Sequence, residues 1–392
     1  MRARSARPGR TAAPPRRAAA PRSWLPQFED ALPRLRGRLE ALVNFESPSD
    51  DAGRVSRLAR WIRDDLESAG VDARTIPCPP RGDAVLARVG GEGGALLLGH
   101  HDTVWPVGAL AEMPFAIKDG RATGPGVFDM KSGIAIAMTV LEVLARQPGP
   151  PAVSLLLAPD EEAGSQASRE LTVATARKHE CVLVLEPSLN GAAKVARKGV
   201  GFFEIQFRGR PAHAGLDPEA GASALAELAR CVLYLEKQAD KARGTTVTPT
   251  VARSGTTLNV VPESGTLAVD LRAWTQEEAA RVERAVRAYR AADPRVTFEP
   301  KGGFNRPPME PTPGSQQLYE RMRGIAAGLG FELGTSRVGG GSDGNLTAAA
   351  GVPTLDGLGP LGDGAHARHE HVIVADLARR AAMLAQFVSE QA

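Results

Sequence analysis

The sequence has little cysteine and no apolar run long enough to cross a membrane. Only three cysteines occur in 392 residues, and they are far apart in the chain (Cys78, Cys181 and Cys231). This excludes a disulfide scaffold and a CxxC metal site. No stretch of about 18 apolar residues exists, so the sequence predicts no membrane-spanning helix. Internal repeats are absent as well.

Acidic residues are missing from the start of the chain. Residues 1–22 contain seven arginines and no Asp or Glu, and the rest has 41 basic against 45 acidic residues. This composition predicts a disordered basic arm over residues 1–23, and an unstructured leader is favoured over an electrostatic arm. A nucleic-acid-binding role rests on this arm alone, and the acidic remainder argues against it. The arm lacks the apolar segment of a signal peptide, which favours the cytoplasm over the periplasm.

The length fits two domains. From Trp24 to about residue 196, continuous apolar runs alternate with helical patterns, which predicts a mainly parallel sheet covered on both faces in an α/β/α fold. The next segment, residues 197–309, has strands of two-residue period in a β-α-β-β-α-β order, which predicts a ferredoxin-like α+β domain. The first pattern returns over 310–392. We therefore expect one α/β domain from 24–196 and 310–392, with the α+β domain inserted.

Polar residues recur just past the apolar runs of the α/β segments. The five that stand out are His100, Asp129, Glu162, Glu186 and His366. Two imidazoles and three carboxylates form a ligand set that holds a pair of divalent metals, with zinc expected. In open α/β sheets, ligands collect beyond the carboxyl ends of the strands. The sequence therefore predicts one metal site built from distant segments.

Two of these motifs contain further candidates. In GHHDTVW, residues two apart share a face of the strand, so Asp102 is expected to orient His100 through the other ring nitrogen. In PDEEAG, neighbouring carboxylates repel one another unless cations compensate them. Glu162 is expected to bind metal there, and Glu161 to accept a proton from the attacking water. The alternative for GHHDTVW is two histidines at a strand end without a ligand role. The alternative for PDEEAG is an acidic loop exposed to solvent.

The remaining ligands differ in how firmly the spacing defines them. Asp129 follows a Gly-Pro-Gly turn, and both of its oxygens are available, one for each metal. Glu186 closes a buried strand and needs a partner. His366 lies near His369 and His371, and the spacing alone leaves open which of the three binds metal.

The order of these motifs resembles that of the di-zinc exopeptidase family. The motifs are GHHDTVW, GPGVFDMKSG, DEEAGS, LEPS, GRPAHAG and a late histidine after GDGA. The family includes glutamate carboxypeptidase (the carboxypeptidase G type), aminoacylase, acetylornithine deacetylase and succinyl-diaminopimelate desuccinylase. The resemblance runs from about residue 40 to the end, and HDTVWP, GPGVFDMKSG and GGGSD favour the glutamate carboxypeptidase branch.

The resemblance implies roles for the candidate metal ligands. His100 and Glu186 would bind one zinc, and Glu162 and His366 the other, with Asp129 as the bridge between them. Two Zn²⁺ per subunit are expected, with Co²⁺ or Mn²⁺ as substitutes. Glu161 would be the general base. A cis peptide bond is expected directly after Asp129.

The resemblance also implies that residues 197–309 are a lid and dimerisation domain on a di-zinc catalytic domain. His213 in GRPAHAG would reach the active site of the partner subunit in a homodimer. Asn259 and Arg272 of the lid, together with Gly340 and Ser342 of the Gly-rich loop, would bind substrate. The motif ARKGV contains two basic residues, Arg197 and Lys198. We expect them either to bind an acidic side chain of the substrate or to be solvated residues at the edge of the strand.

The expected function is hydrolysis of the amide bond to a C-terminal amino acid of a small peptide or N-acyl amino acid. The closest alternative is a deacylase that uses the same metals and recognises the acyl group. A non-catalytic carboxylate-binding protein is disfavoured, because the complete ligand set and the general base are present. No membrane or nucleic-acid partner is expected.

Overall fold

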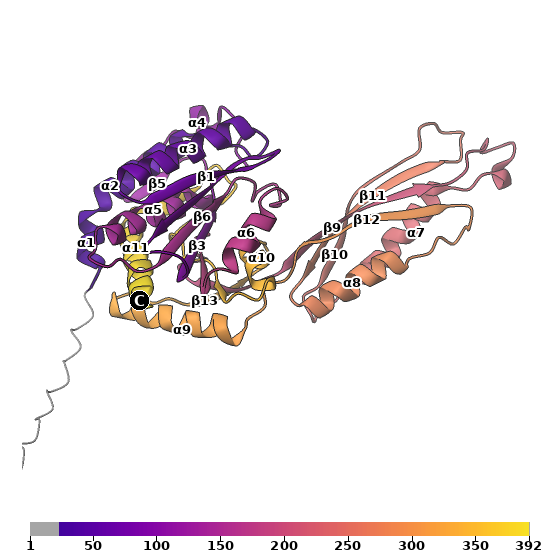
Figure 1. Cartoon of the computed structure of the whole chain (residues 1–392). Coiled ribbons are helices and arrows are strands. Elements are labelled where there is room, and N and C mark those ends of the chain that lie inside the picture. The colour runs from indigo at the N-terminus through magenta and orange to yellow at the C-terminus, as the bar shows by residue number, and fades with distance from the viewer. Residues whose placement is uncertain (1–22, 392) are drawn as a thin grey trace, which may run out of the picture.

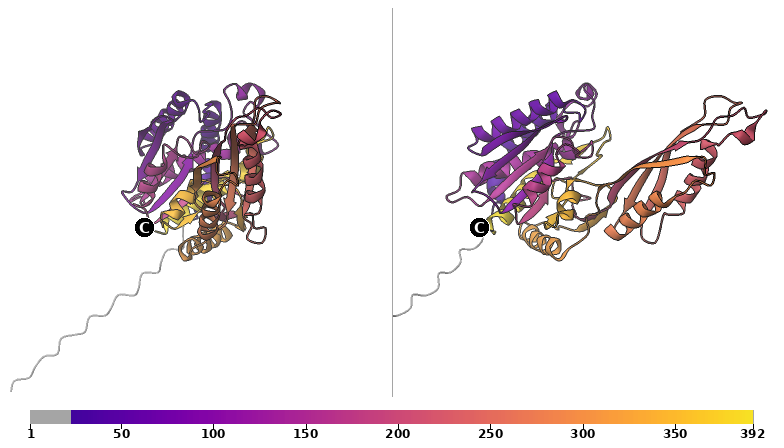
Figure 2. Two further views of the ribbon diagram at one scale, coloured as in Figure 1. Left: turned by 90° about the vertical axis from the view of Figure 1, so that its right-hand side faces the viewer. Right: turned by 45° about the vertical axis from the view of Figure 1, so that its right-hand side comes forward.

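The computed structural model describes residues 23–391, and the predicted basic arm, residues 1–23, lies outside this range except for its last residue. An α/β body is built from the first and last parts of the chain, and an elongated body from the middle (Figure 1). The elongated body stands away from the α/β body and meets it at one end only (Figure 2). We call the elongated body the lid (residues 197–309).

The α/β body contains a six-stranded sheet of order β1-β2-β6-β3-β7-β14. Strands β6, β3, β7 and β14 are parallel to one another, whereas β1 and β2 pair in antiparallel fashion at one edge. The strands are β1 (Asp72–Cys78), β2 (Gly82–Val89), β3 (Ala95–His100), β6 (Val153–Ala158), β7 (Cys181–Val184) and β14 (Thr354–Leu355). The predicted α/β class with a mainly parallel sheet is confirmed, with an antiparallel edge that the pattern did not reveal.

Both faces of this sheet are covered by helices. Because side chains alternate along a strand, Leu97 and Leu155 enter the larger core, which α5 and α11 share, whereas Leu96 and Leu156 enter a smaller core beside α6. The helices of this body are α1 (Leu25–Asp30), α2 (Leu32–Asn44), α3 (Ala52–Ser68), α4 (Ala109–Glu112), α5 (Ser132–Ala145), α6 (Arg169–Ala176), α9 (Pro313–Gly328), α10 (Asp343–Ala349) and α11 (Val374–Ser389). Within residues 23–391, no helix has the length and apolar character needed to cross a membrane.

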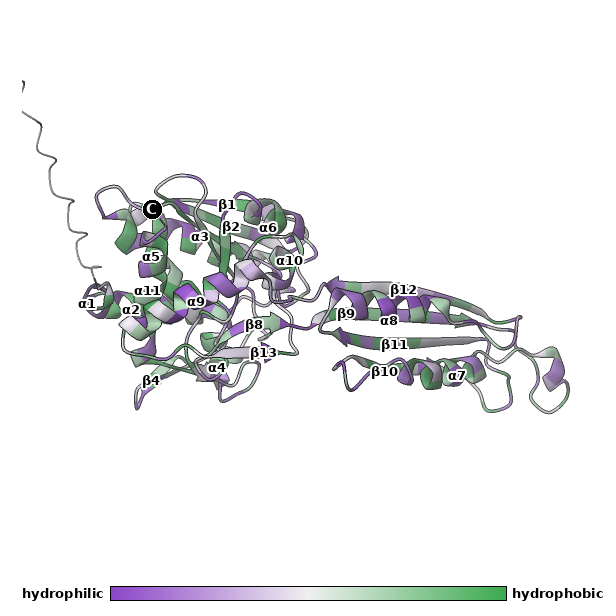
Figure 3. Cartoon of the chain, turned by 90° about the horizontal axis from the view of Figure 1, so that it is seen from below, coloured by the Kyte–Doolittle hydropathy of each residue, from purple (hydrophilic) through white to green (hydrophobic). Residues whose placement is uncertain are grey.

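Local sequence explains where several helices begin. The side chain of Asp51 accepts a hydrogen bond from the backbone of Arg54 and caps α3. Thr312 forms a capping box with Ser315, and Pro313 occupies the first turn of α9. Helix α5 is apolar nearly all round because it is buried between the sheet and α11, and its ribbon is mostly green in Figure 3.

Two small sheets complete the α/β body. One has the order β15-β16-β5-β4, and the other is a parallel pair of β8 with β13. Their strands are β4 (Ala116–Lys118), β5 (Arg121–Thr123), β8 (Ala193–Arg197), β13 (Thr335–Val338), β15 (Gly362–Asp363) and β16 (His371–Ile373). The loop that carries His366 connects β15 and β16, and β16 contacts the irregular turn η1 (Val127–Lys131). Most of these strands are too short to show a hydrophobic period.

The lid is an antiparallel sheet with two helices on one face. Its strand order is β10-β11-β9-β12, and its chain order is the predicted β-α-β-β-α-β. The elements are β9 (Gly199–Arg208), η2 (Pro218–Ala220), α7 (Ala224–Glu236), β10 (Thr246–Ser254), β11 (Ser264–Ala273), α8 (Gln276–Ala288) and β12 (Thr297–Arg306). The lid has a hydrophobic core of its own, drawn entirely from residues 203–304. We therefore propose 24–196 with 310–392 as one domain and 197–309 as the other.

Leu97→Ala tests the assignment of the central strand β3. Leu97 is fully buried between the sheet and its helices. Its truncation should lower the free energy of unfolding by about 2–5 kcal/mol. The buried apolar atoms that are removed no longer contribute to stability, and the cavity that they leave costs further stability. Leu189→Ala is the control, since this side chain is 44% exposed; it should change the value by about 0.5 kcal/mol or less. Urea denaturation followed by circular dichroism measures both, and equal effects would contradict the assignment.

Candidate di-metal active site

Polar residues at the carboxyl ends of three parallel strands meet at one edge of the central sheet. β3 ends at His100, β6 is followed by Glu161 and Glu162, and β7 is followed by Glu186. These three strands are direct neighbours in the sheet, so their ends lie side by side. This is the edge where open α/β sheets bind ligands.

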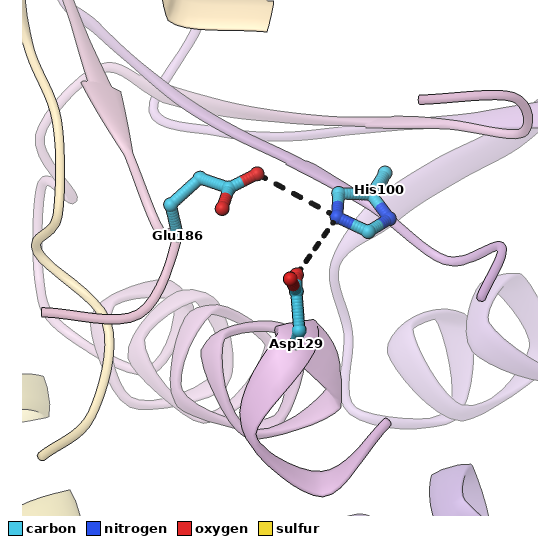
Figure 4. Close-up of side chains that lie close together, drawn as sticks. All are labelled: His100, Asp129 and Glu186. Carbon is cyan, nitrogen blue, oxygen red and sulfur yellow. Dashed lines mark hydrogen bonds and ion pairs between the residues drawn. The ribbon is translucent and has the colours of Figure 1, made fainter. Parts of the chain in front are cut away.

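The first ligand cluster is formed by His100, Asp129 and Glu186. Figure 4 shows both carboxylates directed at the same nitrogen of the His100 ring. Nε2 of His100 lies 3.3 Å from Oδ1 of Asp129 and 3.5 Å from Oε1 of Glu186. One ligand atom from each residue lies within 4.8 Å of the others, which is close enough for a single ion.

The second ligand cluster is formed by Asp129, Glu162 and His366. Nε2 of His366 lies 3.4 Å from Oδ2 of Asp129 and 3.1 Å from Oε1 of Glu162. Among the residues described, the other two late histidines, His369 and His371, join neither cluster. His366 is therefore the late histidine that the fold brings to this edge of the sheet.

Asp129 belongs to both clusters and offers a different oxygen to each. Its backbone leaves the helical region within η1, with φ −112° and ψ 95°, and its carboxylate is directed at His100 (Figure 4). The peptide bond between Asp129 and Met130 is cis, as the resemblance implied. The two clusters are thus two halves of one site.

The donor set fits a pair of divalent cations. Burial lowers the pKa of His100, but Asp102, Asp129 and Glu186 outweigh it and raise that pKa well above its usual value. Hydrogen bonds to Asp129 and Glu162 raise the pKa of His366 to about 10. Carboxylates are in excess here, and the residues offer the nitrogen and oxygen donors that zinc prefers.

Asp102 lies on the opposite side of the His100 ring from the two ligand carboxylates. Nδ1 of His100 is 3.3 Å from Oδ1 of Asp102 and 3.0 Å from its backbone oxygen. The same carboxylate accepts hydrogen bonds from the backbone N–H groups of Glu161 and Glu162, at 3.0 and 3.1 Å, and from Ser49 at 2.6 Å. Asp102 therefore orients the histidine and also holds the turn after β6 in place.

Glu161 is held by an arginine that the sequence analysis did not identify. Nη2 of Arg306, at the end of β12, donates to Oε1 of Glu161 at 2.8 Å and to its backbone oxygen at 2.8 Å. The same nitrogen lies 2.8 Å from Ser165 and 3.3 Å from Asp343. Burial raises the pKa of Glu161 well above its usual value, although Arg306 opposes the shift. A carboxylate with a raised pKa is suited to accept and release a proton.

The structure corrects the predictions for Arg197 and Ser342. Arg197 was expected either to meet substrate or to be solvated, but it is 3% exposed and donates two hydrogen bonds of 2.8 Å to Asp356. Its guanidinium also lies 3.5 Å from Glu186. Ser342 was expected to bind substrate, but its side chain is buried, caps α10 and donates to Asp356 at 2.6 Å. The buried carboxylate of Asp356 therefore accepts hydrogen bonds from both Arg197 and Ser342.

A pocket of about 800 Å³ opens beside the second cluster. Its lining includes Glu161, Arg272, Arg306, Gly340 and His366. The guanidinium of Arg272 is paired with Asp270, at 2.8 Å, rather than directed freely into the pocket. The predicted substrate residues Arg272 and Gly340 thus lie at the pocket, with Arg272 already held by a carboxylate of its own strand.

His213 and Asn259 lie elsewhere. Both are exposed in loops at the far end of the lid, where the backbone of Ala214 donates to that of Asn259 (Figure 1). Strand β9 alone, ten residues long, separates this end from the junction by about 30 Å at ~3.3 Å per residue. Neither residue therefore reaches the ligand clusters of its own chain.

The chain resembles known hydrolases over most of its length. Residues 96–390 match the model of peptidase family M20/M25/M40. Carboxypeptidase G2 of Pseudomonas sp. (strain RS-16) is 30% identical over 375 residues, which cover 92% of this chain and 90% of that protein. Acetylornithine deacetylase of Shigella sonnei (strain Ss046) is 29% identical over 199 residues, which cover 50% of each.

Solved structures share the fold. A tripeptidase from Staphylococcus aureus subsp. aureus Mu50 superposes with a TM-score of 0.75 at 19% identity, covering 92% of this chain and 98% of that chain. The M20 family metallo-carboxypeptidase Sso-CP2 from Sulfolobus solfataricus gives 0.70 at 16% identity, covering 90% and 98%. With the family match and the shared fold, we conclude that the chain belongs to peptidase family M20/M25/M40, a family of metal-dependent peptidases and amidohydrolases.

Proposed function

We propose that the chain is a zinc-dependent exopeptidase that cleaves the amide bond to a C-terminal amino acid. The observation that carries the proposal is the shared carboxylate of Asp129, which faces two ligand clusters beside the pocket lined by Glu161 and Arg272. Two Zn²⁺ per subunit would be held by these clusters, and Co²⁺ or Mn²⁺ would be substitutes. The similarity to a carboxypeptidase over 92% of the chain supports this choice of reaction.

The residues around the clusters supply the proton chemistry. Bound metal ions would polarise the scissile carbonyl and lower the pKa of the attacking water. Glu161 accepts the proton of that water and passes it to the nitrogen of the leaving amine, so that the base is restored in each cycle. Arg306 fixes the Glu161 side chain at 2.8 Å, and Asp102 fixes the ring of His100.

The pocket supports recognition of an acidic C-terminal residue. Arg272 would bind the terminal carboxylate by exchanging its contact with Asp270 for a bidentate contact with substrate. Lys198 lies outside the lining of this pocket, with Nζ 5.3 Å from the centre of the Trp274 ring. Among the residues described, no carboxylate pairs with it. Burial lowers the pKa of Lys198, and the positive charge of Arg272 lies close enough to lower it further. We therefore propose Lys198 for a second carboxylate of a substrate that extends beyond this pocket. The backbone of Gly340 lines the same pocket without a side chain in the way.

A deacylase that removes a small acyl group is the second candidate. The observation in its favour is the similarity of half of the chain to acetylornithine deacetylases. The metal ligands and the base would be the same, and only the recognised side of the amide would differ.

We further propose a homodimer formed through the lid. Of the ten large hydrophobic side chains that are exposed in residues 23–391, seven lie in the lid (Phe202, Leu216, Leu225, Leu233, Val251, Leu258 and Val260). Exposed apolar side chains gathered in one region indicate an association surface. Such a dimer would also give His213 a role, because the lid of one subunit could bring it to the active site of the other.

Glu161→Gln tests the general base. The substitution keeps a hydrogen-bond acceptor for Arg306 but removes proton transfer, so kcat should fall by about 10²-fold or more. The metal content should stay near two ions per chain. Glu320→Gln is the control, because this side chain is exposed on α9 and pairs with Arg323 of the same helix. Steady-state kinetics and elemental analysis measure both quantities, and more than a few per cent of residual activity would contradict the mechanism.

Metal removal and a substrate series test the reaction class. Activity on N-acylated amino acids should disappear with a chelator and return with Zn²⁺. Substrates with C-terminal Glu or Asp should be preferred, and Lys198→Met should reduce that preference through a higher KM. Cleavage rates that follow the acyl group instead would favour the deacylase. No turnover despite two bound metals would favour a non-catalytic carboxylate-binding protein.

Subunit mixing tests the role of His213. His213→Ala and Glu161→Gln chains should each be nearly inactive alone, because every active site lacks one group. After subunit exchange, half of the dimers should be mixed and each should contain one intact site, which restores about a quarter of the normal activity. Full activity of His213→Ala alone, or no recovery in dimers shown to be mixed, would contradict action across the subunits.

A further inference from the structure

A buried glutamate outside both ligand clusters connects the segments that carry them. Glu370 is 1% exposed and lies four residues after His366, in the loop between β15 and β16. Its carboxylate accepts four hydrogen bonds. Oε1 accepts from the backbone N–H groups of Phe128 and Asp129, at 2.8 and 3.0 Å, and Oε2 from the backbone N–H of Gly126 and the indole of Trp105, each at 2.9 Å.

These four donors belong to two other segments of the site. Trp105 belongs to the segment after β3, in which Asp102 follows the last strand residue, His100. The three backbone donors belong to the turn that places Asp129 between the clusters. Together with its own loop, which carries His366, Glu370 therefore touches all three segments that supply histidines and the shared aspartate. The ligand Asp129 itself donates its backbone N–H to Glu370.

The turn before Asp129 needs a hydrogen-bond acceptor for its backbone N–H groups. It contains Gly124 and Gly126 with positive φ values of 141° and 73°, a conformation in which neighbouring N–H groups do not form a regular ladder. Buried N–H groups must find acceptors, and those facing a carboxylate form charge-assisted bonds of greater strength than neutral ones. The carboxylate of Glu370 thus determines how this turn sits against the loop of His366.

We propose that Glu370 is a positioning residue of the di-metal centre, which sets the carboxylate of Asp129 between His100 and His366 so that two metal ions are bound together. The inference rests on the proposed di-metal function. Among the residues described, Glu370 belongs to neither ligand cluster nor to the lining of the pocket, and it acts through the backbone of Asp129. Partners of this kind typically change metal affinity or activity by about 10–100-fold when they are replaced.

Glu370→Gln is the variant of choice because it keeps the shape of the side chain. Whichever way the carboxamide is turned, its NH₂ group faces two N–H donors, so that two of the four hydrogen bonds are lost. Trp105→Phe removes one donor only, at Oε2, and leaves the bond to the Asp129 backbone in place. Glu112→Gln is the matched control, since Glu112 is an exposed carboxylate that pairs with Arg368 of the same loop as Glu370.

The measurement is titration of the metal-free full chain with Co²⁺, followed by the visible absorption of the bound ion. The unsubstituted chain should bind two Co²⁺. Glu370→Gln should bind the second Co²⁺ at least about tenfold more weakly, with a changed spectrum, and should lower kcat more than it changes KM. Trp105→Phe should shift the spectrum in the same direction by less, and Glu112→Gln should not shift it.

The outcomes separate this inference from the proposed function. Two Co²⁺ bound by Glu370→Gln with unchanged affinity and spectrum would overturn the positioning role and leave the di-metal function standing. If that variant does not fold, Trp105→Phe decides, and an unchanged spectrum there would overturn the role. Fewer than two Co²⁺ bound by the unsubstituted chain would overturn both.

Discussion

The crowding of carboxylates at one edge of the central sheet is the constraint on which the rest of the structure depends. Five acidic side chains are buried or nearly so within reach of one another (Asp102, Asp129, Glu161, Glu162 and Glu186). Like charges at this separation are unfavourable unless cations or N–H groups face them. Arg306 faces Glu161, Arg197 faces Glu186, and backbone N–H groups face Asp102. The oxygens that remain point at His100 and His366, where metal ions would bind.

The two arginines of this arrangement lie where the chain enters and leaves the lid. Arg197 ends β8 just before the first lid strand, and Arg306 ends the last lid strand β12. Since Arg306 contacts both the carboxylate and the backbone of Glu161, any movement of the lid about this junction would change the surroundings of the proposed base. The junction therefore links the position of the lid to the chemistry of the site.

The architecture of both bodies and the convergence of the candidate ligands could be predicted because they follow from regular patterns. Apolar runs that alternate with helices define the parallel sheet, and parallel strands bring their polar ends to one edge, which is where His100 and Glu186 lie. The resemblance selected His366 among three nearby histidines, a choice that spacing left open. Arg306, at the end of β12, and Glu370, in the loop before β16, were missed because an isolated charged residue has no period. Ser342 was misassigned because a helix cap and a pocket residue look alike in sequence.

The central claim is that Asp129 lies between two metal ions, and diffraction from crystals of the Zn²⁺-loaded protein tests it most directly. Data recorded on either side of the zinc absorption edge locate zinc atoms independently of the protein atoms. We predict two anomalous peaks per chain about 3.5–4 Å apart, one beside Glu186 and His100 and one beside Glu162 and His366. A single peak, or peaks away from Asp129, would contradict the account.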